Sequence, residues 1–176
     1  MYVSRKYKIF FIIAPLVFIL DQITKRAILS NILYGKKIPV INGFFDIVHF
    51  RNTGAAFGMF SGVSDSIREP FFYIVAIIAS LVLIWFLRSL RDDRILLPAA
   101  LSLVFGGMLG NVLDRIRLGS VVDFLSFHIG NKILDFEFLT KQYNIELEWP
   151  AFNVADSAIT IAMFLLIYSV LFLKDE

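Results

Sequence analysis

The sequence contains no cysteine and only two histidines, His49 and His128, among its 176 residues. The absence of cysteine excludes disulfide bonds, thiol catalysis and thiolate metal sites, and it also excludes lipid modification of the chain on a cysteine of its own. The two histidines lie far apart and belong to no His-Glu-x-x-His motif. A zinc protease is therefore not expected.

The sequence also has little net charge, only +2, and its basic residues form no long run. This pattern does not favour a nucleic-acid partner. Apolar residues are abundant instead, because 58% of the chain is hydrophobic and 19 residues are phenylalanine. An ordinary soluble domain is about 45–50% apolar. We therefore interpret residues 1–176 as a single integral membrane domain, with lipid as the solvent for its excess apolar surface.

Four apolar stretches are each long enough, at roughly 17–20 residues, to cross a bilayer as a helix. The first follows Arg5, Lys6 and Lys8, as a signal peptide would, but it has no small-x-small cleavage site, so we expect it to be retained. The sequence thus predicts an all-α membrane protein with four transmembrane helices. The predicted spans are 9–27, 71–87, 95–113 and 154–173.

The density of Lys and Arg near the helix ends indicates the orientation. The N-terminus, the turn 88–94 and the C-terminal tail are densely basic, which places both termini on the cytoplasmic side. The loops 28–70 and 114–153 would then be extracytoplasmic. Residues 45–50 alternate apolar and polar before a turn at Asn52-Thr-Gly54, and we expect short strands there, with nearby phenylalanines such as Phe57 and Phe60 in the interface.

Charged and amide side chains gather at one end of the predicted bundle, where a membrane makes them expensive. Within each of three groups, a spacing of three or four residues places the side chains on one helix face near the outer end of a span. The groups are Asp21 with Lys25 in the first span, Asn111 with Asp114 and Arg115 in the third, and Asn153 with Asp156 in the fourth. Asp123, after the third span, forms a fourth group by itself. We expect all four groups to converge at the extracytoplasmic surface. The pairs Asp21–Lys25 and Asp114–Arg115 are equally consistent with ion pairs that tie helix ends together.

Asp123 and Asp156 differ from the other charged residues, because neither has a basic neighbour in the sequence. Two carboxylates brought close together do not both ionise easily, so one keeps a proton. Such a pair can act as general base toward water and as general acid toward a peptide carbonyl. The spacing is compatible with a catalytic dyad, but structural acids are the more common explanation of such spacing.

Five motifs follow one another in an order that resembles the lipoprotein signal peptidases. They are Leu20-Asp21-Gln-Ile-Thr-Lys25, Phe-Arg-Asn52-Thr-Gly54-Ala-Ala-Phe-Gly58, Gly-Gly-Met-Leu-Gly110-Asn111-Val-Leu-Asp114-Arg115, Gly119-Ser-Val-Val-Asp123-Phe and Phe-Asn153-Val-Ala-Asp156-Ser. Each motif alone is weak, but together they are specific and cover nearly the whole chain.

The resemblance implies a membrane aspartyl endopeptidase of the bacterial inner membrane, also called signal peptidase II. Such enzymes cut the signal peptide from prolipoproteins before a diacylglyceryl-modified cysteine, and need no metal or cofactor. The expected partners are these substrates and membrane lipids, and the chain is expected to be a monomer.

By the same resemblance, Asp123 and Asp156 are the catalytic dyad, with Asn111 and Asn153 orienting their carboxylates. Arg115 and Asn52 would hold the substrate backbone and nearby loops, and Asp21 and Lys25 would shape the site or bind substrate. The small residues from Gly54 to Gly58 suit either a close approach to the substrate backbone or simply a tight loop.

The segment 126–149 departs from the resemblance, because it is longer and more acidic than the family's usual link between the two aspartates. Extending a loop costs only about 0.6 kcal/mol per doubling of its length. We therefore expect the dyad to be undisturbed, while substrate access or contacts with other proteins change.

Three rival functions fit the sequence less well. A serine mechanism would use Ser120 or Ser157, but neither lies in a Gly-x-Ser-x-Gly motif or has an evident histidine partner. A transporter would place its charges through the depth of the membrane, whereas the second and fourth spans are nearly free of charge inside. An inactive relative would be expected to have lost one aspartate.

Overall fold

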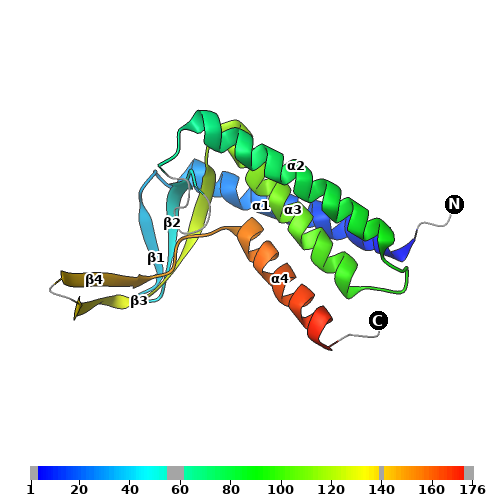
Figure 1. Ribbon diagram of the computed structural model, residues 1–176. Helices are drawn as coiled ribbons and strands as arrows, with labels where there is room; N and C mark the ends of the chain where they lie inside the picture. Colours follow the sequence, from blue (N-terminus) through cyan, green and yellow to red (C-terminus); the bar gives the residue numbers. More distant parts are fainter. Residues whose placement is uncertain (1–3, 55–61, 139–140, 173–176) are drawn as a thin grey trace.

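The computed structural model describes residues 4–54, 62–138 and 141–172. Within these residues, four long helices lie together and a small sheet covers one end of them (Figure 1). All four helices are long and apolar enough to cross a membrane, which confirms the predicted fold class. In chain order the elements are α1 (Arg5–Asn31), β1 (Lys37–Ile41), β2 (Phe45–Asn52), α2 (Asp65–Ser89), α3 (Leu96–Leu118), β3 (Val121–Phe138), β4 (Lys141–Glu148) and α4 (Val154–Phe172).

Helix α3 is the centre of the bundle and packs against the other three helices. Two glycines allow this close approach. A Cβ on Gly106 would lie 2.5 Å from the carbonyl oxygen of Ala14 in α1, and a Cβ on Gly107 would lie 2.6 Å from that of Ala155 in α4. Small residues of this kind let membrane helices bring their backbones together. The outward faces expose large apolar side chains, as expected for contact with lipid.

The strands lie in the order β1-β2-β3-β4, and each pair of neighbours is antiparallel. Strand β2 confirms the short strand predicted around 45–50, and it pairs with the first residues of β3. The far part of β3 pairs with β4 as a hairpin that projects away from the helices (Figure 1). The sequence identified this region only as a long polar insertion.

The root of the β3–β4 hairpin is closed by hydrogen bonds. The backbone N–H of Trp149 donates to the carbonyl oxygen of Phe127 at 2.8 Å, and Ser126 Oγ donates to Glu148 Oε1 at 2.8 Å. Lys37 in β1 forms an ion pair with the same carboxylate at 3.0 Å. The two chain segments that enter and leave the hairpin therefore lie side by side at its base.

The alternation of side chains in β3 positions the strand on the bundle. Val122 and Phe124 are buried and pack with Ile28 of α1. Val121 and Asp123 point to the opposite side. The sheet is thereby attached to α1, and Asp123 is turned toward the space beside α3 and α4.

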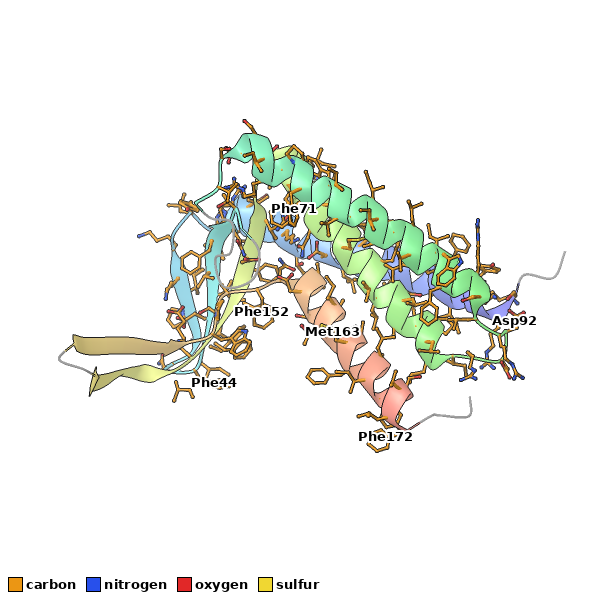
Figure 2. All side chains as sticks on the ribbon, viewed as in Figure 1. Phe44, Phe71, Asp92, Phe152, Met163 and Phe172 are labelled. Atoms are coloured by element: carbon orange, nitrogen blue, oxygen red, sulfur yellow. The ribbon has the colours of Figure 1, made fainter. Side chains whose placement is uncertain are left out.

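The end of the bundle remote from the sheet gathers the basic segments. Lys6 at the start of α1 donates a 2.9 Å hydrogen bond to the carbonyl oxygen of Arg88, at the end of α2. Figure 2 shows Asp92, in the turn between α2 and α3, and Phe172 toward this end, whereas Phe152 lies toward the sheet. The N-terminus and the basic turn 88–94 thus share one side of the bundle.

Candidate active site

The C-terminal end of α3 brings the chain back toward the bundle and into β3. Gly119 follows the helix with a left-handed φ of 67°, a conformation that glycine adopts without strain. Its N–H closes the helix on the carbonyl oxygen of Arg115 at 2.9 Å. The turn delivers Asp123 to the first part of β3, where its side chain is buried.

The start of α4 is fixed by a reciprocal pair of hydrogen bonds. The backbone N–H of Asp156 donates to Asn153 Oδ1 at 2.9 Å, and the N–H of Asn153 donates to Asp156 Oδ2 at 3.2 Å. This is the capping-box arrangement, in which the residue before a helix and the third residue within it satisfy each other's backbone donors. Both side chains are thereby held rigidly at the helix terminus.

Asn153 also links the two aspartates. Its side-chain N–H donates to Asp123 Oδ1 at 2.8 Å. Asn153 therefore holds Asp123 through its side-chain amide and Asp156 through its backbone N–H. The pKa of Asp123 is raised to about 7, first by burial and then by the negative charge of Asp156; hydrogen bonds from Asn153 and Asn52 oppose the rise. A carboxyl group of this kind holds a proton up to about neutral pH.

Asn111 on α3 holds the second aspartate from the other side. Its side-chain N–H donates to Asp156 Oδ1 at 2.8 Å, while its Oδ1 accepts from Lys25 Nζ at 2.8 Å. An ammonium group only donates, so Lys25 fixes which end of this amide faces Asp156. The orientation of the dyad therefore depends on a lysine that does not contact either aspartate directly.

Lys25 lies at the centre of a buried ionic cluster. Its Nζ is 2.9 Å from Asp21 Oδ2 and 3.0 Å from Asp114 Oδ2. Asp21 also accepts the backbone N–H of Ala155 in α4 at 3.0 Å, and Asp114 accepts that of Val122 in β3 at 3.1 Å. The cluster thus ties α1, α3, α4 and β3 together behind the dyad.

The predicted ion pair between Asp114 and Arg115 was wrong. Asp114 instead forms an ion pair with Lys25 on α1. Neighbours in a helix sequence point about 100° apart, so Arg115 faces away from Asp114. Its guanidinium lies 4.2 Å above the ring of Phe72, and its Nη2 donates to the carbonyl oxygen of Gly54 at 3.0 Å.

Asn52 and Gly54 form the rim of the site at the end of β2. The N–H of Gly54 donates to Asn52 Oδ1 at 3.0 Å, a turn typical of asparagine. Residues 55–61 lie outside the described part of the chain, and so do the predictions made for Gly58, Phe57 and Phe60.

A cavity of about 780 Å³ contains both aspartates. Its polar side is formed by Asn52, Asn111, Arg115, Asp123 and Asp156, and its apolar side includes Ile159, Ile161 and Met163 of α4. Figure 2 shows Phe152 between the sheet and α4, and Met163 further along α4. A polar site with an apolar wall suits a substrate that is part peptide and part hydrocarbon.

Comparison with known proteins identifies the family. The profile described as "Signal peptidase (SPase) II" matches residues 13–172. The chain belongs to the signal peptidase II family. It is 38% identical to the lipoprotein signal peptidase of Desulforapulum autotrophicum, over 93% of this chain and 91% of that protein. It is 43% identical to that of Geobacter sulfurreducens, over 91% of this chain and 89% of the other.

A solved structure described as a bacterial membrane enzyme matches this signal peptidase II fold with a TM-score of 0.77 and 34% identity, over all of this chain and 99% of the other. A second such structure gives 0.77 and 33%, over 99% and 93%. Together with four membrane-spanning helices, the family establishes a protease of the bacterial inner membrane.

The two serines considered for a serine mechanism, Ser120 and Ser157, both donate hydrogen bonds to backbone carbonyl oxygens. Ser157 Oγ donates to the carbonyl oxygen of Asn153 at 2.9 Å, and Ser120 Oγ to that of Leu118 at 3.4 Å. His49 Nδ1 is hydrogen-bonded to the carbonyl oxygen of Ile32, and His128 Nε2 lies 3.2 Å from Asp46 Oδ2. In the described ranges, no group of three His, Cys, Asp or Glu side chains could hold a metal ion.

Sequence reasoning missed Gln22, whose side-chain N–H lies 3.2 Å from oxygens of both Asp21 and Asp114. Its place beside Asp21 in the first motif was the available signal. It also missed Trp149, which lines the cavity from the chain that leaves the hairpin; Phe152, which lines the cavity beside it, begins the fifth motif. Nothing in the spacing of Trp149 indicated that it lies beside the two aspartates.

Proposed function

We propose that this chain is an aspartyl endopeptidase that removes signal peptides from diacylglyceryl-modified prolipoproteins, cutting before the lipidated cysteine. The observation that carries the proposal is the pair Asp123 and Asp156, held by Asn153 within one cavity that has a polar side and an apolar wall. The related lipoprotein signal peptidases supply the substrate class.

In this mechanism, Asp156 is the base and Asp123 holds the shared proton. The carboxylate of Asp156 removes a proton from a water molecule as the water oxygen bonds to the peptide carbonyl carbon. Asp123, with its raised pKa, donates a hydrogen bond to the carbonyl oxygen. The proton on Asp156 then passes to the amine as the C–N bond breaks, leaving a free carboxylate on the signal peptide and a free amine on the cysteine.

The remaining polar groups position the dyad and its substrate. Asn111 and Asn153 hold the two carboxylates, and Lys25, Asp21 and Asp114 fix that frame from behind. Arg115 and Asn52 hold the Gly54 rim, beside which the substrate backbone would lie. All these groups come from one chain, in keeping with a monomeric enzyme.

The proposed orientation places the dyad on the extracytoplasmic side and both termini in the cytoplasm. It is supported by the gathering of Lys6, Arg88 and the turn 88–94 at the end remote from the sheet. Because the natural chain has no cysteine, a single cysteine at Tyr34 or at Asp92 can be tested for labelling by a membrane-impermeant reagent in intact spheroplasts. Tyr34 should be labelled and Asp92 protected.

The catalytic proposal is tested with purified Asp123→Asn and Asp156→Asn variants and a lipid-modified prolipoprotein in a gel-shift assay. Each variant should lose at least about a thousandfold in cleavage rate, the scale expected when acid–base catalysis is removed. Asp93→Asn, in the exposed turn between α2 and α3, is the matched control and should retain activity. Activity in either dyad variant would remove that residue from the mechanism.

A further inference from the structure

A second groove lies on the face of α3 turned away from the active site. It encloses about 220 Å³ between α1 and α3. Whereas Asn111 and Arg115 of α3 line the active-site cavity, Asp114, Arg117 and Leu118 line this groove. From α1 it is lined by Phe18, Ile19, Gln22, Ile23, Lys25, Arg26 and Leu29. The two hollows are thus separated by α3 itself.

Two arginines at the groove carry uncompensated positive charge. Arg26 and Arg117 are both exposed, and neither guanidinium group forms a hydrogen bond or ion pair with the described part of the chain. Asp114 does not neutralise them, since its oxygens are already engaged by Lys25, Gln22 and the backbone of Val122. The groove therefore presents two free guanidinium groups above a floor whose charges are satisfied.

The rest of the groove is apolar and faces lipid. Ile19 and Ile23 on α1 are 50% and 60% exposed, and they continue the groove from Arg26 toward the middle of the membrane span. Arg26 lies five residues before the end of α1 and Arg117 one residue before the end of α3, so the arginines mark the boundary between hydrocarbon and water. Cations above an apolar track match the chemistry of an acidic lipid.

We propose that this groove binds one acidic phosphoglycerolipid, independently of the proteolytic reaction. Its phosphate lies between Arg26 and Arg117, and the upper part of one acyl chain lies along Ile23 and Ile19. Arginine is suited to this role because its planar guanidinium donates two parallel hydrogen bonds to a phosphate. A zwitterionic lipid would bring a positive group to the same place and is disfavoured.

The position of the groove links lipid binding to the frame of the enzyme. Its floor contains Lys25 and Asp114, which join α1 to α3, and Lys25 orients Asn111 toward Asp156. A lipid that bridges Arg26 and Arg117 also bridges these helices. Bound lipid therefore stabilises the folded bundle, and this stabilisation is measurable without any substrate.

The test compares lipids and variants by thermal unfolding of the purified protein in detergent. Phosphatidylglycerol should raise the unfolding temperature more than phosphatidylcholine with the same acyl chains, and native mass spectrometry should detect one retained molecule. The Arg26→Gln/Arg117→Gln variant should bind phosphatidylglycerol about thirtyfold more weakly, since each basic side chain near a lipid surface changes binding about fivefold. Arg26→Lys/Arg117→Lys keeps the charge and should keep the preference.

The matched control removes two exposed arginines from the other end of the bundle, as Arg5→Gln/Arg88→Gln. It should bind phosphatidylglycerol as the natural chain does. An equal loss in this control would show general attraction to an acidic surface and would overturn the site. An equal temperature shift with glycerol 3-phosphate would show that no lipid chain is needed, and would also overturn the proposal.

Discussion

Replacing Lys25 with methionine tests whether the buried ionic cluster is structural. Methionine keeps most of the apolar stem but removes the ammonium group, which lies 2.9 Å from Asp21, 3.0 Å from Asp114 and 2.8 Å from Asn111. The lysine is 1% exposed, so water does not replace it. Two acidic groups are then left buried without a cation.

The expected cost is large because one partner of a buried pair is removed. Such changes destabilise proteins by about 3–5 kcal/mol. For a chain of this size, each kcal/mol lowers the unfolding temperature by about 2–4 °C, so we expect a fall of roughly 10 °C. Cleavage should fall as well, even below the melting transition, because the amide of Asn111 loses the group that turns it toward Asp156.

The measurement is thermal unfolding in detergent, with cleavage assayed well below the transition. Arg26→Met, one residue along α1 but exposed, is the control and should shift the unfolding temperature by less than about 2 °C in the absence of acidic lipid. The double variant Lys25→Met/Asp114→Asn should be more stable than the sum of its single changes, by about 1–3 kcal/mol. A Lys25→Met protein as stable as the natural chain would refute the structural reading.

Three further predictions concern single sites. The pKa of Asp123 is raised from 3.8 to about 7, so the stability that its protonated form contributes is complete below about pH 4 and is lost as pH rises through 7. Between pH 5 and 8 the unfolding temperature should therefore fall by about 5 °C more in the natural chain than in Asp123→Asn. Equal pH profiles for the two proteins would contradict this. Gly110→Ala places a Cβ against the Asp21 carboxylate and should destabilise the bundle and abolish cleavage, whereas Gly62→Ala, with nothing within 4 Å, should be silent in unfolding and activity assays. Ser120→Ala removes only hydrogen bonds of 3.4 and 3.5 Å and should leave turnover within about threefold; a collapse of turnover would revive a serine mechanism.

The sequence predicted the four helices and strand β2 because their signals are local. Long apolar runs identify the spans, and the alternation at 45–50 identifies β2. The groups of polar residues were also found, because spacing of three or four along a helix places side chains on a common face. Such spacing shows which side chains share a helix face, but not which residues of other elements they contact.

Partners across elements could not be predicted from the sequence, because they depend on how the helices rotate against one another. Spacing did not show that Asp114 meets Lys25 rather than Arg115, nor that the backbone of Ala155 binds Asp21. The double role of Asn153, as helix cap and as link between two acids, needs the path of β3 beside α4. The β3–β4 hairpin was missed although residues 134–138 and 143–148 alternate apolar and polar side chains, a pattern typical of strands.

Because the β3–β4 hairpin is closed at its root, its length does not affect how Asp123 and Asp156 are positioned. The chain that departs after Phe127 is back at Trp149, one hydrogen bond away, and proceeds from there to Asn153. The return path is therefore the same whether the projecting part is long or short. The hairpin can therefore change in length and in sequence without changing the distance between Asp123 and Asp156.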